Sequence, residues 1–172
     1  MRPFRLQFHY AISNMFDHSA LLPYNFSLVC MGVFNKYPSK RLPHIQTVDI
    51  RSRSVQSNCL ITERIIGVKF DSPIPFIKTC LIRERSILDR KTKELTQISE
   101  NLAFRNYFIC TEKIAYKQTE NGVSYRQSIE MDCASIFSRF TEMFRERCIQ
   151  NSQIGLEALK SKIEFLKVSY SM

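Results

Sequence analysis

Glycine and tryptophan are scarce in this chain of 172 residues, which has four glycines and no tryptophan. So few glycines argue against phosphate-binding loops, propellers and other folds that need many tight turns. Long apolar runs are missing too: the longest candidate, residues 21–34, is interrupted by Pro23, Asn25 and Ser27, and a membrane-spanning helix needs ~18–20 apolar residues. The first residues show no clean apolar segment with a small-residue cleavage site, so no secretory signal is expected.

The common catalytic and metal-binding patterns are also missing from the sequence. Its three histidines (His9, His18 and His44) have no metal-binding spacing, and no G-x-S-x-G elbow is present. The six cysteines are widely spaced, with no C-x-x-C pair, so we expect buried free thiols rather than a zinc site or a disulfide framework. We identify no catalytic constellation, and we expect no metal and no cofactor.

Positive charge is the strongest compositional signal. The chain has 25 Lys and Arg against 16 Asp and Glu, a net charge of +9, which predicts an anionic partner such as a phosphate, a lipid headgroup or a nucleic acid. No aromatic RNA-binding run or GXXG loop is present, and acidic residues interrupt the basic ones, which weakens the nucleic-acid interpretation. Hydrophobic residues make up 44% of the chain. This is an ordinary globular composition, and it excludes intrinsic disorder of the whole chain.

Alternation with period two predicts an antiparallel sheet. Six segments read as strands, and short links, one of them the Asn121-Gly122 turn, favour hairpins. The strand segments are 45–55, 60–68, 79–88, 94–104, 107–116 and 123–133.

Two helices are predicted around this sheet. A short one covers 27–35, and a long one runs from 136 to about 168 with apolar residues every three or four positions. Next to a curved sheet, the long helix is the element best suited to close a cavity; the alternative is that it only covers the core. Two prolines in 71–78 predict a loop that carries Ile74, Phe76 and Ile77.

Arg64 lies between apolar neighbours in one predicted strand. By alternation it shares one face with Leu60 and Ile66, whereas Glu63 shares the other face with Ile65. Whichever face points inward buries a charge, and a buried charge without an opposite partner costs several kcal/mol. The alternative is that both charges pair across strands on a solvated face.

One series of motifs, in matching order and spacing, resembles the PRELI-like family, most closely its slowmo branch. It begins with Lys36-Tyr-Pro38, continues with His44-Ile45 and Val48-Asp49, and ends with Arg53 and Arg64-Ile-Ile66. Further stretches agree, and the resemblance covers roughly residues 12–166: these stretches are 15–18, 101–106, 111–117 and 151–159.

Four features depart from the family pattern. About six extra residues (Leu21–Phe26) precede the first helix, and Ser39-Lys40 replaces the second proline of the family motif. The proline-rich segment is shorter than in the family. Ile154 stands where the family has a helix lysine, and loss of that cation would weaken headgroup capture or change lipid preference.

The resemblance implies a fold and a function. The fold is α+β: residues 1–172 form a single PRELI-like domain whose curved antiparallel sheet of about six or seven strands wraps around a long C-terminal helix, leaving a START-like lipid cavity. Such proteins are not enzymes. They carry phosphatidic acid, or in some members phosphatidylserine, between mitochondrial membranes. They work in the intermembrane space, peripherally on anionic membranes, with a small twin-CX9C helical-hairpin partner.

The resemblance also implies site residues. Lys36 and Arg64 are expected to contact the lipid phosphate, and His44, Arg147 and Asn151 to lie around the cavity mouth. Ile74, Phe76 and Ile77 are expected to form a lid that contacts the membrane. Two alternatives remain: a binding or scaffold protein of this fold without transfer activity, and an RNA-binding module.

Overall fold

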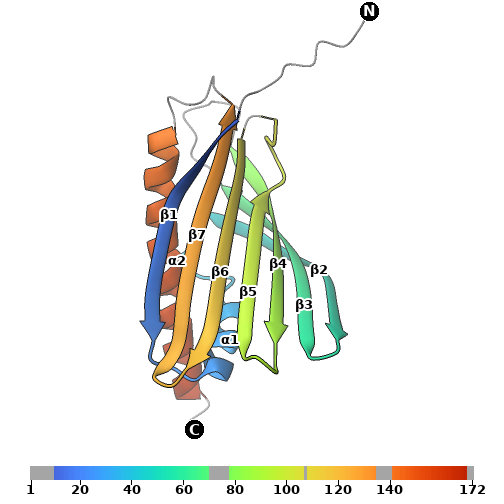
Figure 1. Cartoon of the computed structure of the whole chain (residues 1–172), viewed down its shortest axis with the longest axis vertical. Helices are drawn as coiled ribbons and strands as arrows, with labels where there is room; N and C mark the ends of the chain where they lie inside the picture. The colour runs from blue at the N-terminus through green and yellow to red at the C-terminus, as the bar shows by residue number, and fades with distance from the viewer. Residues whose placement is uncertain (1–9, 70–77, 107, 135–140, 170–172) are drawn as a thin grey trace, which may run out of the picture.

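The computed structural model of the protein describes residues 10–69, 78–106, 108–134 and 141–169. Seven strands form one antiparallel sheet in the order β1-β7-β6-β5-β4-β3-β2, accompanied by two helices (Figure 1). The elements are β1 (Tyr10–Leu22), α1 (Phe26–Phe34), β2 (Ile45–Gln56), β3 (Cys59–Lys69), β4 (Thr79–Asp89), β5 (Glu94–Asn101), β6 (Phe108–Thr119), β7 (Gly122–Ala134) and α2 (Thr141–Ser169).

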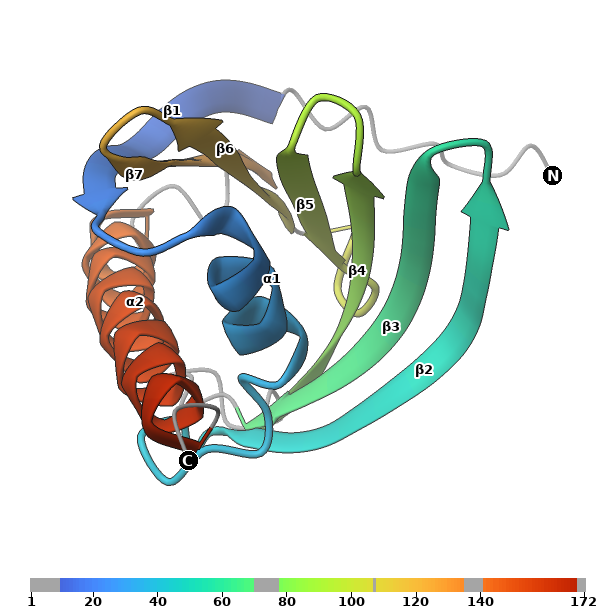
Figure 2. The same ribbon diagram turned by 90° about the horizontal axis from the view of Figure 1, so that it is seen from below.

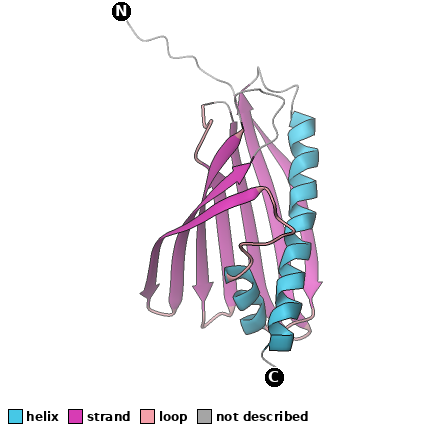
Figure 3. Ribbon diagram, turned by 180° about the vertical axis from the view of Figure 1, so that it is seen from behind, coloured by secondary structure: helices cyan, strands magenta, loops and turns pink. Residues whose placement is uncertain are grey.

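The sheet is strongly curved, and its concave face holds both helices. Seen from below, the strands bend around α1, while α2 lies beside the β1 edge (Figure 2). Seen from behind, α2 runs along the open side of the sheet, and the β2–β3 hairpin leans away from it (Figure 3). The predicted α+β architecture, with a curved antiparallel sheet and a long C-terminal helix, is thus confirmed. Within the described ranges, neither helix is long and apolar enough to cross a bilayer.

The residues that are extra relative to the family pattern belong only in part to the core, since Leu21 is 54% exposed. Leu21 and Leu22 complete β1, and Phe26 begins α1. The Leu22 and Phe26 side chains are both buried. Asn25 caps the helix, because its side-chain oxygen accepts a hydrogen bond from the Leu28 N–H at 2.8 Å. The insertion therefore lengthens two elements rather than forming a surface loop.

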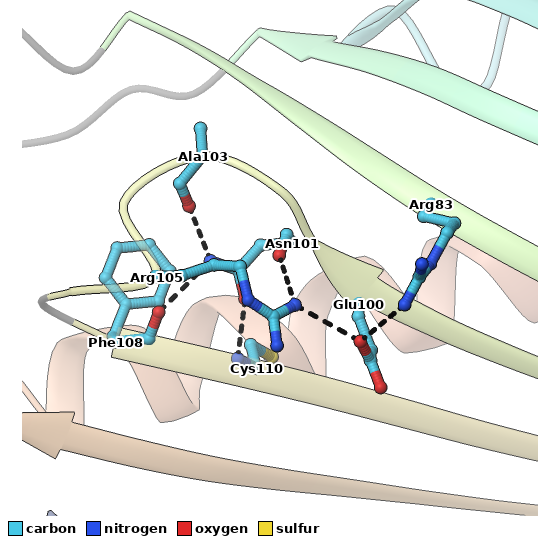
Figure 4. A network of polar contacts seen from close by, with 7 residues as sticks. All are labelled: Arg83, Glu100, Asn101, Ala103, Arg105, Phe108 and Cys110. Atoms are coloured by element: carbon cyan, nitrogen blue, oxygen red, sulfur yellow. Dashed lines mark hydrogen bonds and ion pairs between the residues drawn. The ribbon is translucent and has the colours of Figure 1, made fainter.

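The segment after β5 differs from its prediction. The strand ends at Asn101 rather than at residue 104, and Phe104 has a positive φ of 63°. The Asn101 side-chain amide donates to the carbonyls of Ala103 and Phe108, and its oxygen accepts from the Cys110 N–H at 2.8 Å (Figure 4). These bonds satisfy backbone groups that a longer strand would have paired, so the chain turns here.

Helix α1 packs between the sheet and α2. Val29 and Val33 of α1 are fully buried in the main core cluster, together with Leu159 and Ile163 of α2. The helices meet closely at Gly32, where a Cβ atom would lie 2.6 Å from Ile163 Cγ1 and 3.1 Å from Leu159 Cδ1. This position therefore requires a residue without a side chain.

We expect Gly32→Ala to destabilise the fold, although alanine is the better helix former. The clash with Ile163 should cost ~1–3 kcal/mol and lower the melting temperature by several degrees. The matched control is Gly155→Ala in α2, because a Cβ atom added there would meet no atom within 4 Å; this variant should gain up to ~1 kcal/mol from helix propensity. Thermal unfolding followed by circular dichroism distinguishes the two variants, and equal melting temperatures would contradict the close α1–α2 contact.

Candidate functional site

A cavity of about 230 Å³ lies between the concave face of the sheet, the segment after α1, and α2. Its wall is largely apolar and comes from strands β2 to β7, from the segment after α1 and from α2. Ile66, Ile82, Ile114, Phe144 and Leu159 are among the residues that line it. The long helix thus borders a cavity and does not merely cover the core.

The strand register places a polar belt across this apolar wall. Arg64, Glu84, Ser99 and Glu112 are consecutive cross-strand partners on β3, β4, β5 and β6. Partners in adjacent strands point to the same face, so all four side chains belong to the concave side. The concave face of the sheet therefore carries three ionisable side chains in one row.

The structure decides which face of β3 points inward. Arg64 faces the concave side and is only 3% exposed. The Arg64 Nε donates a hydrogen bond to Glu84 Oε1 at 2.8 Å, and the Arg64 Nη2 bonds the same oxygen. The Ser86 hydroxyl and the Gln97 side-chain amide also donate to Glu84 Oε1. Glu63 lies on the other face, 3.9 Å from Arg85. The buried guanidinium thus finds its anion within the protein.

This pairing sets Arg64 apart from the other predicted headgroup residues. Glu84 lines the cavity, whereas Arg64 is not among the lining residues. The Arg64 guanidinium lies 5.7 Å from the ring centre of Tyr37, which does line the cavity. Contact of Arg64 with a phosphate stays a prediction, and the geometry favours an indirect role through Glu84 and Tyr37.

Lys36 lines the cavity directly. It follows α1, and its ammonium lies 5.0 Å from the ring centre of Tyr37. Burial has the largest influence on the pKa of Lys36 and lowers it, but attraction by Tyr37, Glu84 and Glu112 outweighs burial and raises the pKa above its ordinary value. Lys36 is therefore a fixed positive charge inside a largely apolar cavity.

Three further predicted residues line the same cavity: His44, Arg147 and Asn151. Burial lowers the pKa of His44, and the nearby cations Arg147 and Lys36 lower it further. His44 is thus held neutral at pH 7, where it can still donate a hydrogen bond. Lys36, His44, Arg147 and Asn151 thus line one cavity, and their contact with a lipid headgroup stays a prediction.

Two other sequence features lie elsewhere. The expected lid residues Ile74, Phe76 and Ile77 fall outside the described residues. Ile154, which stands in place of the family's lysine, is 43% exposed and is not among the cavity-lining residues. The side chain at position 154 therefore points away from the Lys36 region.

Glu112 is a cavity residue that our sequence analysis missed. Its Oε1 accepts from Gln127 Nε2 at 2.5 Å, and Gln127 Oε1 in turn accepts from the Tyr125 hydroxyl and from Ser152 of α2. Burial raises the pKa of Glu112, although Lys36 and Gln127 act in the opposite direction. Alternation from Tyr116 back along β6 would have placed this carboxylate on the inward face.

The raised pKa of Glu112 predicts a pH-dependent stability. Ionisation is harder in the folded protein than in the unfolded chain, so the wild type should lose stability as pH rises above the ordinary glutamate pKa of about 4.5. We expect Glu112→Gln to be more stable than wild type at pH 7.5, with the difference vanishing below pH ~4. Urea unfolding at several pH values measures this. Glu120→Gln, in the exposed β6–β7 turn, is the control. If the free energy of unfolding changed with pH in the same way for Glu112→Gln and Glu120→Gln, the prediction would be contradicted.

The cysteines and possible metal ligands complete the inventory of reactive groups. Cys30 and Cys80 are buried, and Cys59, Cys110 and Cys148 are partly buried free thiols. Within the described ranges, no three His, Cys, Asp or Glu side chains are grouped as metal ligands would be.

Comparison with solved structures agrees on the fold. The protein TTHA0849 from Thermus thermophilus matches with a TM-score of 0.63 at 11% identity, covering 87% of this chain and 97% of that protein. Ara h 8.0201 matches with a TM-score of 0.61 at 13% identity, covering 89% of this chain and 98% of the other. At these identities the matches show the fold alone, which is START/Bet v1-like.

Sequence comparison identifies relatives and a family. The UPS-like protein C36.10 of Schizosaccharomyces pombe is 25% identical over 168 residues, covering 90% of this chain and 91% of the relative. The mitochondrial protein UPS2 of Saccharomyces cerevisiae is 32% identical over 111 residues, covering 59% of this chain and 48% of that protein. The model of the PRELI-like family matches residues 27–169, and the chain therefore belongs to the PRELI-like family.

Proposed function

We propose that this protein binds a phospholipid in its cavity, with the headgroup phosphate at Lys36, and transfers it between mitochondrial membranes. The observation that carries the proposal is a fixed ammonium in a largely apolar cavity. Glu84 and Glu112 already attract this ammonium, but a simple apolar ligand would make no use of it. A lipid with an anionic headgroup offers a phosphate for the ammonium and apolar chains for the rest of the wall.

The energetics favour a carrier of this kind. Each methylene of an acyl chain exposed to water costs ~0.8 kcal/mol, so a two-chain lipid needs an apolar shelter to leave a bilayer. The cavity of about 230 Å³ is below the ~300–1,000 Å³ of usual small-molecule sites. Loading a two-chain lipid therefore requires the cavity to widen, and α2, which borders it along one side, is the element whose movement would do so.

The polar groups around Lys36 suit a phosphate monoester. Arg147 offers a guanidinium fork, which matches phosphate oxygens, and His44 and Asn151 offer hydrogen-bond donors. Arg64 does not line the cavity and acts indirectly, by holding the Glu84 side chain in place. We therefore propose phosphatidic acid as the preferred ligand.

The setting of this activity follows from the family and from charge. One relative is named as mitochondrial, and we propose the intermembrane space for this chain, with a small twin-CX9C helical hairpin as its partner. The net charge of +9 favours docking on anionic membranes at ~1 kcal/mol per well-placed Lys or Arg, aided by Ile74, Phe76 and Ile77. We propose one domain over residues 1–172, a carrier rather than an enzyme.

The test is recovery and transfer of lipid. Mass spectrometry of lipid extracted from the purified protein should detect a phospholipid, and transfer of fluorescent phosphatidic acid between liposomes should exceed that of phosphatidylcholine. Absence of both extracted lipid and transfer would contradict the proposal and favour a scaffold protein of the same fold. A salt-dependent RNA gel shift without lipid selectivity would favour an RNA-binding module instead.

A further inference from the structure

Two thiols meet inside the cavity. Cys110 lies on β6 and Cys148 on α2, and both line the cavity wall. The rings of Phe108 and Phe144, two residues before Cys110 and four residues before Cys148, stack 5.7 Å apart, and the two thiols interact with each other. Neither cysteine belongs to a motif, and the residues that separate them in sequence include all of β7 and the start of α2. The fold alone brings them together.

The surroundings of the pair favour reaction between the two sulfur atoms. The Cys110 backbone is held in place, because its N–H donates to Asn101 Oδ1 at 2.8 Å (Figure 4). The hydrogen bond from Cys110 lowers the pKa of Cys148, although burial acts in the opposite direction. A lowered pKa increases the thiolate fraction, and the thiolate is the attacking species in disulfide exchange. Both thiols are only partly buried, and the same widening of the cavity that would admit a phospholipid would let a disulfide such as oxidised glutathione reach them.

We propose that Cys110 and Cys148 form a reversible intramolecular disulfide by exchange with a low-molecular-weight disulfide such as oxidised glutathione. The Cys148 thiolate attacks one glutathione sulfur, forms a mixed disulfide and releases one glutathione thiolate. Cys110 then loses its proton and attacks the Cys148 sulfur, which releases the second glutathione. The protein loses two electrons and two protons, and one oxidised glutathione becomes two reduced ones.

The position of this bond gives it a consequence for loading, which rests on the proposed function. Cys148 lies between Arg147 and Asn151 on α2, where the helix borders the Lys36 region. A bond to β6 would tie α2 to the opposite wall of the cavity. A cavity that has to widen to admit a phospholipid would then be held closed, so the oxidised protein should transfer lipid more slowly.

The first measurement is the disulfide itself. The purified chain is equilibrated in buffers with different ratios of oxidised to reduced glutathione, alkylated and digested with trypsin. Peptides 106–113 and 148–160 should appear joined, lighter by two hydrogen atoms than their sum, in wild type and in Cys59→Ser, whose cysteine lies in the β2–β3 hairpin. Cys148→Ser should lack the joined peptide. Absence of this peptide from wild type in excess oxidised glutathione, or pairing of Cys110 with another cysteine, would overturn the proposal.

The second measurement is transfer of phosphatidic acid by the oxidised and reduced forms of each variant. Wild type and Cys59→Ser should be slowed at least about tenfold by oxidation, and Cys148→Ser should be equally fast in both buffers. Equal rates for the oxidised and reduced wild type would overturn the effect on loading. If the reduced protein also transfers no lipid, the proposed function fails. The peptide measurement would still decide whether the disulfide forms.

Discussion

Lys36→Glu should transfer phosphatidic acid at least about 100-fold more slowly than wild type. Losing a hydrogen bond to a buried charged group costs ~1.5–3 kcal/mol, and each 1.4 kcal/mol is about tenfold in affinity. The new carboxylate would also face Glu84 and Glu112, the two acidic groups that raise the pKa of the wild-type lysine. Repulsion of the lipid phosphate then adds to the lost attraction. Transfer between liposomes measures the effect.

Two further variants make this result specific. Lys40→Glu makes the same change in net charge at an exposed position outside the cavity wall, so it controls for weaker membrane docking and should remain near wild type. Lys36→Met keeps the length of the side chain and adds no third acidic group, so it should be less destabilising than Lys36→Glu and lose about 10- to 100-fold in transfer. A Lys36→Met protein that transfers phosphatidic acid at the wild-type rate would show that the phosphate binds elsewhere.

The elements that the sequence predicted well are those with regular alternation. The hairpins from β2 to β7 follow the predicted order, and the Asn-Gly turn is present, with Gly122 at a φ of 134°. Alternation did not identify β1, whose pairing with β7 shifts between Asn14 and Phe16. A bulge of this kind moves successive side chains to the opposite face and breaks the period-two pattern, so only the family resemblance indicated a strand there.

The residues of the candidate site were predictable where they belong to one local sequence motif. Lys36 follows directly from the Lys-Tyr-Pro motif, and the structure places it in the cavity wall. The partner of Arg64 was not predictable, because alternation identifies the two faces of β3 but not the register against β4. That register joins Arg64 to Glu84 rather than to Arg83 or Arg85, and it depends on the path of the chain between the two strands. A local pattern contains no such information.

The pairing of Arg64 with Glu84 predicts a large effect on stability. Arg64→Met would leave Glu84, which is 5% exposed, as a buried carboxylate without its cation, at a cost of ~3–5 kcal/mol. For a chain of this length, each kcal/mol lowers the melting temperature by ~2–4 °C, so a decrease of ~6–20 °C is expected. The neighbouring pair is a matched control: Arg85→Met breaks a contact on the exposed face and should cost at most ~1 kcal/mol.

The double variant Arg64→Met/Glu84→Gln separates the structural role of the pair from a role in lipid binding. The amide oxygen at position 84 can still accept from Ser86 and Gln97, the two other donors to Glu84, and neither position of the pair keeps a charge. We expect it to recover at least half of the lost stability, since removing both charges avoids the penalty of an unpaired ion. If Arg64 acts only through Glu84, the double variant should transfer phosphatidic acid as fast as Glu84→Gln alone; slower transfer by a stable double variant would show that the Arg64 guanidinium itself contacts the phosphate.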